Sequence, residues 1–356
     1  MTRRRTLLAS ALAGGLAAPA VVRAADTVSW RMVTSWPRNL PGPGMTAQRL
    51  ADRIGAMSGG RLQVQLFAAG ELVPALEVFD AVQGGTAEMA HTASFFWAGK
   101  MPAAAFFTAV PFGLLPLEHA AWIEHGGGQA LWDELYAPYG IKPFMAGNTG
   151  TSMGGWFRKE INGLADLQGL RYRIPGLGGE MMKALGCVPT LVPPPEIIAS
   201  LQAGTIDATE FLGPWSDLAA GFYKAAPFYY WPGLHEPNGT GEALVALEAW
   251  SALPPDLQAV VENAARAEAA YAVAEAEWQD QAALDQLVGE HGVQLRRFPA
   301  EVEAAARTAA GEVLATFDAR GGLDQRIYQS FLAARQRAES WSRLSSQAFL
   351  EARNGA

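Results

Sequence analysis

The sequence predicts an α/β protein built as two lobes around a cleft, and three observations support this fold class. The chain has 356 residues, which is more than one hydrophobic core usually holds. The first segments after the N-terminus alternate as strand, loop, helix and strand, the order typical of a parallel sheet. The segment 72–91 is repeated at 191–210, so a second unit of similar construction is expected.

Composition and charge exclude several classes of protein. Half of the residues are hydrophobic and 17% are charged, as in a well-packed soluble protein. The net charge of −8 argues against nucleic acid or an anionic membrane surface as partner. Cys187 is the only cysteine, so no internal disulfide is expected, and we interpret it as a small buried hydrophobe. Scattered histidines without a CxxC pair make a structural zinc site unexpected.

Residues 1–24 have the pattern of an export signal. Arg3, Arg4 and Arg5 precede an apolar Ala/Gly/Leu run, which ends in a Val-Arg-Ala cleavage-like site. The arginines before Thr-Leu-Leu resemble a twin-arginine signal, and an ordinary secretory signal is the alternative. Both interpretations predict an exported, periplasmic protein.

The mature chain begins with regular α/β elements. Residues 28–34 alternate as a strand, residues 45–57 form an amphipathic helix, and residues 61–67 form a second strand. A turn-rich Pro/Gly segment at 35–44 separates the first strand from the helix.

The repeated segment predicts where the two lobes meet. Residues 72–91 align without gaps to 191–210, and each copy has a proline before a helix, a glycine after it, and a short strand. The alignment places His91 and Glu210 at equivalent strand ends, which would face each other across the cleft. A chance match between two ordinary helix–strand units is the alternative.

Aromatic residues follow the first copy. Phe95, Phe96 and Trp97 come directly after the His91 strand end, so they either belong to the core or form the wall of a pocket. A helical region at 118–135, interrupted by Gly126–Gly128, comes next.

The segment 147–175 supplies the main binding candidates. Arg171 and Arg173 alternate with Tyr172 and therefore share one face of a strand. We expect Arg173 to bind a carboxylate, since a guanidinium matches carboxylate geometry with two parallel hydrogen bonds. Asn148, at a neighbouring turn, supplies an amide for the same ligand. The alternative for Arg173 is an ion pair within the protein.

The remaining chain predicts a second pocket wall and a helical tail. Trp215 and the aromatic, acidic segment 223–237 suit a pocket wall. A strand is expected at 241–250, a long helix at 255–290, a strand at 293–298, and helices at 300–319 and 323–351. The amphipathic tail would pack on its own lobe or on a partner subunit.

Motifs for catalysis do not stand out. The chain has no G-x-S-x-G, no P-loop and no dinucleotide fingerprint after a strand. Glu210 and Glu236 offer oxygen ligands for a cation that could bridge to a carboxylate. Binding is therefore favoured, with an exported hydrolase or lyase using Glu210 and His91 as one alternative. A sensor subunit that presents a ligand to a membrane kinase is another.

Several strings resemble the periplasmic solute receptors of TRAP transporters, the DctP family. They are AGELVPALEVFDAV, AEMAHTASFFWAGK, FFTAVPFGL, GNTGTSMGGWFRKEINGLADLQGLRYRIPG, LQAGTIDATEFLGPWSD and FYYWPGLHEPNG. The resemblance covers residues 28–320. Within the family, the sequence is similar in detail to the subgroup of 2-oxo acid and lactate receptors. The resemblance implies a periplasmic-binding-protein fold with a hinged cleft and no catalysis. It also implies delivery of the ligand to a membrane permease.

The resemblance also assigns roles to residues. The arginine that clamps the ligand carboxylate falls on Arg173. A cation, Na⁺ or Ca²⁺, would be held by Glu210, Glu236, Ser152 and the carbonyl of Phe211. That subgroup usually has Gln at the Ser152 position and Trp at the Phe211 position.

The implied domain organisation has two lobes and a tail. Lobe 1 comprises 26–146 and about 234–253, and lobe 2 comprises 147–233 and about 254–320. Residues 322–356 would form the long C-terminal helix that pairs two subunits in relatives.

Overall fold

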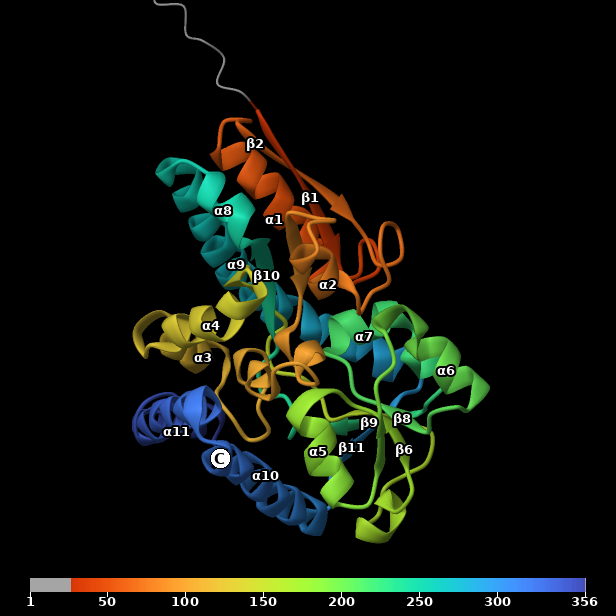
Figure 1. Ribbon diagram of the computed structural model, residues 1–356. Helices are drawn as coiled ribbons and strands as arrows, with labels where there is room; N and C mark the ends of the chain where they lie inside the picture. Colours follow the sequence, from red (N-terminus) through yellow and green to blue (C-terminus); the bar gives the residue numbers. More distant parts are fainter. Residues whose placement is uncertain (1–26, 356) are drawn as a thin grey trace, which may run out of the picture.

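The computed structural model describes residues 27–355, so the predicted export signal lies outside the described residues. The chain forms two lobes, each built on its own mixed sheet, with helices on both faces of each sheet (Figure 1). The α/β two-lobed architecture predicted from the sequence is confirmed.

The sheet of lobe 1 has the order β2-β1-β3-β10-β4. Strands β1, β2 and β3 run parallel, and β10 runs antiparallel to both of its neighbours. Its strands are β1 (Val28–Thr34), β2 (Leu62–Phe67), β3 (Met89–Thr92), β4 (Ile141–Asn148) and β10 (Thr240–Ala246).

Alternating side chains bury both faces of this sheet. Met32 belongs to one apolar cluster and Val33 to the other, because neighbouring residues of a strand point to opposite faces. The Met32 face is covered by α1 (Pro43–Met57) and the first part of α9 (Pro255–Gly289). The other face is covered by α2 (Val78–Gln83), η1 (Ser94–Trp97), η2 (Pro102–Phe107), α3 (Pro116–His125) and α4 (Gly128–Tyr136).

The sheet of lobe 2 has the order β11-β9-β5-β8-β6-β7, and β5 is its antiparallel strand. Trp156 and Phe157 point to opposite faces, as do Tyr229 and Tyr230. Its strands are β5 (Gly155–Phe157), β6 (Arg171–Arg173), β7 (Val188–Thr190), β8 (Ala208–Thr209), β9 (Phe228–Trp231) and β11 (Gln294–Arg297).

Four helices cover the lobe 2 sheet. Helices α5 (Gly176–Ala184) and α10 (Ala300–Arg320) pack on the Phe157 face. Helices α6 (Ile197–Ala203) and α7 (Pro214–Ala220) pack on the Trp156 face. Short helices complete the fold: η3 (Ala137–Tyr139), η4 (Leu164–Leu167), η5 (Pro194–Glu196), η6 (Phe222–Lys224) and α8 (Leu247–Ala252).

Three segments carry the chain from one sheet to the other. Residues 149–154 lead from β4 to β5, and residues 232–239 lead from β9 back to β10. The third connection is α9, whose Val261 and Ala265 are buried in the lobe 1 core while Leu287 is buried in the lobe 2 core. This helix therefore belongs to both lobes.

The C-terminal tail packs partly on its own chain. Helix α11 (Gly322–Ser342) buries Ile327 and Phe331 against lobe 1, and the Phe331 ring lies 5.3 Å from those of Phe106 and Trp122. Figure 1 shows α11 beside α3, with α10 leading to it. Helix α12 (Ser346–Asn354) buries no residue.

Two sequence-based element bounds are wrong. The helix expected at 323–351 is interrupted at 343–345, where the Ser345 hydroxyl donates to the Trp341 carbonyl oxygen at 2.8 Å and competes with the helical backbone. The strand expected at 241–250 ends at Ala246, because the helix formers Leu247, Glu248 and Ala249 start α8.

A buried carboxyl group lies in the core of lobe 1. Glu242 of β10 is fully buried and accepts hydrogen bonds from Trp97 Nε1 at 2.7 Å and from the Tyr136 hydroxyl at 3.0 Å. Burial raises the pKa of the Glu242 carboxyl to about 8, although the two hydrogen bonds lower it. The folded protein therefore holds a proton here at neutral pH.

The raised pKa of Glu242 predicts that the stability of the protein depends on pH. The Glu242→Gln substitution should make this pH dependence smaller. In the unfolded chain this carboxyl loses its proton near pH 4.5, so its stabilising contribution is complete below that pH and is lost as the pH rises through about 8. We expect the Tm of the native protein to fall more between pH 5 and pH 8 than that of Glu242→Gln, in scanning calorimetry. Parallel Tm profiles for the two proteins would contradict this assignment.

Candidate functional site

The candidate site lies where the carboxyl ends of strands from both lobes meet the connecting segments. Arg173 ends β6 and Glu210 follows β8 in lobe 2, while His91 lies in β3 and Asn148 ends β4 in lobe 1. In sheets with parallel strands, ligands bind at this edge. The repeated segments do place His91 and Glu210 at equivalent positions, each at or just after the last residues of the strand.

Arg173 and Glu210 form a buried ion pair. The two strands run parallel with Arg173 paired to Thr209, so the next residue, Glu210, lies beside the arginine. Arg173 Nη1 donates to Glu210 Oε1, and Nε donates to the Val192 carbonyl oxygen at 3.1 Å. Arg173 is 2% exposed and Glu210 1%. By contrast Arg171, on the same strand face, is exposed and paired with Asp207.

Two carboxylates and an imidazole lie together beside this pair. Glu210, His235 and Glu236 each present a ligand atom within 4.8 Å of the others. His235 Nε2 lies 3.2 Å from Glu210 Oε2, and the Ser152 hydroxyl contacts Glu236 Oε1 at 3.4 Å. Burial, and next the charge of Glu210, raise the pKa of Glu236 well above its ordinary value. Ser152 comes from the connecting segment 149–154, His235 and Glu236 come from the connecting segment 232–239, and Glu210 follows β8.

A cavity adjoins the cluster on the lobe 1 side. Its volume is about 30 Å³, which is enough for only one or two water molecules. Glu236 lines the cavity and also belongs to the carboxylate cluster, so it joins the two features. The other lining side chains include Trp36, Thr46, His91, Phe95, Asn148 and Leu212.

His91 is held in one tautomer. Its Nδ1 accepts from Trp36 Nε1 at 3.0 Å, so Nε2 carries the proton and donates to the Ala146 carbonyl oxygen at 3.1 Å. Complete burial lowers the pKa of His91 to about 4. The imidazole is therefore neutral at physiological pH, and both of its nitrogens are engaged.

Asn148 lies in the cavity wall with its amide engaged. Its Nδ2 donates to Asn238 Oδ1 at 2.5 Å and to the Thr240 hydroxyl at 3.3 Å, while its Oδ1 accepts from Gly150 N at 2.9 Å. Thr240 in turn contacts His119 Nδ1 at 2.8 Å. This network fixes the amide at the end of β4.

The predicted aromatic residues separate into two groups. Phe95 lines the cavity, whereas Phe96 packs against Phe95 and Trp36 at ring distances of 4.8 and 6.0 Å. Trp215 is half-buried at the start of α7, outside the cavity lining, and its backbone N–H donates to Asp280 at 2.9 Å. The Phe211 ring is buried in lobe 2 against Phe222.

Sequence reasoning missed His235, Trp36 and Thr46. His235 precedes Glu236 within an aromatic segment that was expected to form a pocket wall, so its position was a usable signal. Trp36 and Thr46 lie in and after a Pro/Gly-rich turn, and their place in the cavity depends on how that turn folds back on lobe 1.

Two lobes with buried charged groups between them define this protein as a solute receptor of the periplasmic-binding type. The chain belongs to the DctP family, bacterial extracellular solute-binding protein family 7, whose model matches residues 32–320. The resemblance seen in the sequence is confirmed.

Similar proteins support the same assignment. The chain is 40% identical over 322 residues to the monocarboxylate 2-oxoacid-binding periplasmic protein of Nostoc sp. (strain PCC 7120), covering 90% of this chain and 88% of the relative. A TRAP transporter solute-binding protein from Bordetella bronchiseptica, with calcium and picolinate, superposes with a TM-score of 0.90 at 38% identity, covering 93% and 98% of the two chains.

A second solved structure is similar to the same extent. The TRAP periplasmic solute-binding protein from Pseudoalteromonas atlantica, with sodium and pyruvate, has a TM-score of 0.89 at 39% identity. The match covers 92% of this chain and 99% of that chain. No helix among residues 27–355 is long and apolar enough to cross a membrane.

Proposed function

We propose that this protein captures a small 2-oxo or 2-hydroxy monocarboxylate in the periplasm and delivers it to a TRAP-type membrane permease. The observation that carries the proposal is the buried Arg173 guanidinium at the cleft, beside Glu210, His235 and Glu236. The family and the ligands of the similar proteins support it.

Arg173 is the proposed carboxylate clamp. Its Nε is held by the Val192 carbonyl oxygen, which fixes the orientation of the guanidinium while Nη1 faces the Glu210 carboxylate. A ligand carboxylate would share or take the place of that contact. The cavity is too small for a ligand of several heavy atoms, so binding also requires the lobes to part and close again.

The residues present fit a bound cation. A ligand carboxylate would be a third carboxyl group beside Glu210 and Glu236, and Arg173 supplies one positive charge. Glu236 is buried with only a 3.4 Å contact from Ser152, so its oxygens have capacity for a further partner. Glu210, Glu236, the Ser152 hydroxyl and the Phe211 carbonyl are the proposed ligands for Na⁺ or Ca²⁺. The cation would supply positive charge between these oxygens and the ligand carboxylate.

His235 is proposed to orient the cation ligands. Its Nε2 lies within hydrogen-bonding distance of Glu210 Oε2, and a hydrogen bond of this kind fixes the direction of a ligating carboxylate. The serine at position 152 is shorter than the glutamine usual in this subgroup. Coordination of the cation by the Ser152 hydroxyl would therefore depend more strongly on the position of Glu236.

We infer that the ligand is released unchanged. A hydrolase or lyase would need His91 as a base, yet its Nδ1 lone pair accepts from Trp36 and its pKa is lowered to about 4. Asn148, Phe95 and His91 are better suited to shaping the cavity. Phe96 and Trp215 lie outside the cavity lining, so they would influence the ligand only through the residues that they contact.

Export by the twin-arginine route and a homodimer complete the proposal. The signal residues Arg3, Arg4 and Arg5 support export by the twin-arginine route.

The proposed homodimer is supported by exposed apolar side chains on α12 and on the residues before it. Trp341 is 69% exposed, Leu344 80% and Phe349 65%. A second copy of the chain would cover this apolar surface.

Arg173→Ala should weaken pyruvate binding by more than about tenfold, because the ligand carboxylate and Glu210 both lose their charged partner. Isothermal titration calorimetry measures the change. Arg171→Ala is the matched control, since Arg171 lies two residues away on the same face but is exposed, and it should bind as the native protein does. Equal affinities for the two variants would refute the clamp.

Glu236→Gln should abolish the cation dependence of pyruvate binding. In choline chloride buffer with a chelator, we expect the native protein to bind pyruvate about tenfold more weakly than after Ca²⁺ or Na⁺ is added. The Glu236→Gln variant should respond little, because a carboxamide is a weaker ligand than a carboxylate. Glu180→Gln, an exposed change on α5, serves as control. A full cation response in Glu236→Gln would remove that residue from the site.

Removal of residues 346–356 should convert a dimer to a monomer. Helix α12 buries nothing in its own chain, so the truncated protein should fold, and any fall in its Tm should reflect the lost association alone. Sedimentation velocity compares the two, and a monomer in both cases would contradict the dimer.

A further inference from the structure

One loop of lobe 1 extends into the core of lobe 2. Residues 35–42 join β1 to α1, yet Leu40 is 8% exposed and belongs to the apolar cluster that covers the Trp156 face of lobe 2. That cluster includes Phe211, Leu212 and Phe222. Among the described residues before position 150, Leu40 is the one that belongs to this cluster.

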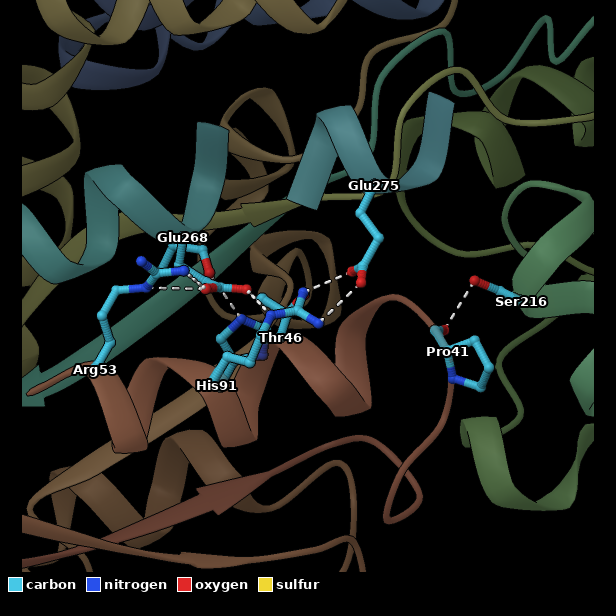
Figure 2. Close-up of polar contacts among 9 residues, drawn as sticks. Pro41, Thr46, Arg53, His91, Ser216, Glu268 and Glu275 are labelled. Carbon is cyan, nitrogen blue, oxygen red and sulfur yellow. Dashed lines mark hydrogen bonds and ion pairs between the residues drawn. The ribbon is translucent and has the colours of Figure 1, made fainter. Parts of the chain in front are cut away.

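A hydrogen bond fixes the loop against α7. The Ser216 hydroxyl donates to the Pro41 carbonyl oxygen at 2.9 Å, across the boundary between the lobes (Figure 2). Gly42 has a φ of +78°, and a Cβ there would lie 2.8 Å from Ser216 Oγ. Glycine therefore permits both the backbone conformation and the close approach of α7.

The loop is rigid enough to hold Leu40 in place. Leu40 N donates to the Pro37 carbonyl oxygen at 3.2 Å, and the Leu40 carbonyl oxygen accepts from Met45 N at 3.0 Å. The loop also connects directly to the cavity, since Trp36 within it and Pro43 directly after it line that cavity. Movement of the loop would therefore change the cavity wall.

The lobe 2 side of this contact leads to the same site. Leu40 packs in the cluster that contains Phe211 and Leu212; Leu212 lines the cavity and Glu210 pairs with Arg173. Ligand and Leu40 thus act on the segment 210–212 from two sides. A hollow of about 300 Å³ lies beside Leu40 between the loop and helices α6 and α7.

We propose that Leu40 is a closure residue: its insertion into lobe 2 stabilises the closed state and so sets how long the ligand stays bound. The inference rests on the proposed receptor function. When the lobes part, Leu40 leaves the cluster and its side chain contacts water, which disfavours the open state. The loop acts on closure, and among the described residues no hydrogen bond joins 35–42 to Glu210, His235 or Glu236.

Leu40→Ala should release ligand faster and shift the protein toward the open state. Leu201→Ala is the matched control, because Leu201 is buried in the same cluster but belongs to α6 of lobe 2 itself. Stopped-flow displacement of pyruvate should give a dissociation rate about tenfold or more above the native rate for Leu40→Ala. Leu201→Ala should lower Tm and leave release within about twofold.

Spin labels on the two lobes measure closure without reference to any ligand. Cysteines introduced at the exposed positions Gln65 and Glu180 can carry them, since Cys187 is buried. We expect Leu40→Ala to enlarge the population with the longer interlobe distance, and Leu201→Ala to leave it unchanged. If both variants give native distances, or if both behave alike in release and distance, the closure role is refuted. If the native protein binds no 2-oxo acid, the receptor proposal is refuted. The closure role of Leu40 is still tested in that case, because the distance measurement needs no ligand.

Discussion

The buried ion pair between Arg173 and Glu210 is the interaction on which the cleft depends. Removing two charges from water is costly, and a buried pair often adds little net stability compared with apolar side chains. Two adjacent parallel strands nevertheless end in these residues, and Val192 and His235 supply further polar contacts to them. A charged arrangement of this kind is explained better by recognition of a charged ligand than by folding.

The path of the chain between the lobes places the remaining polar groups. Each sheet contains one antiparallel strand, β10 in lobe 1 and β5 in lobe 2, and the chain crosses between the sheets three times, at 149–154, at 232–239 and through α9. Ser152 lies in the first crossing, and His235 and Glu236 lie in the second. The residues that connect the lobes are therefore also the residues beside the carboxylate cluster. Any rotation of one lobe relative to the other must therefore change the distances between the residues of the carboxylate cluster.

Local patterns in the sequence predicted much of the fold. The alternation at 28–34, the repeated helix–strand unit and the two-arginine strand all correspond to observed elements, because side-chain period and turn residues are local properties. The residue pattern proposed Arg173 as a carboxylate ligand and Glu210 as a cation ligand, and the resemblance assigned the same roles to both residues. His235 was missed although it stands next to Glu236 in a segment expected to form a pocket wall, whereas Leu40 could not be assigned, since its place depends on a contact between segments far apart in the chain. Leu40 stands in a turn-rich segment, where a lone leucine gives no periodic signal. The bounds at 247–252 and 343–345 were missed although local signals stand there, the helix formers that start α8 and the serine whose hydroxyl bonds to the backbone four residues earlier.

Helix α9 gives the two lobes an unusual relation. Its first half is part of the lobe 1 core, and its last turns are part of the lobe 2 core, within 35 unbroken residues. A cut between the lobes would divide one helix between two hydrophobic cores and leave each with an apolar surface exposed. The lobes are therefore distinct in architecture but are not separable modules. We expect that neither lobe can be transplanted or inserted into another protein without a substitute for its part of α9. We also expect that neither lobe can evolve apart from the other without such a substitute.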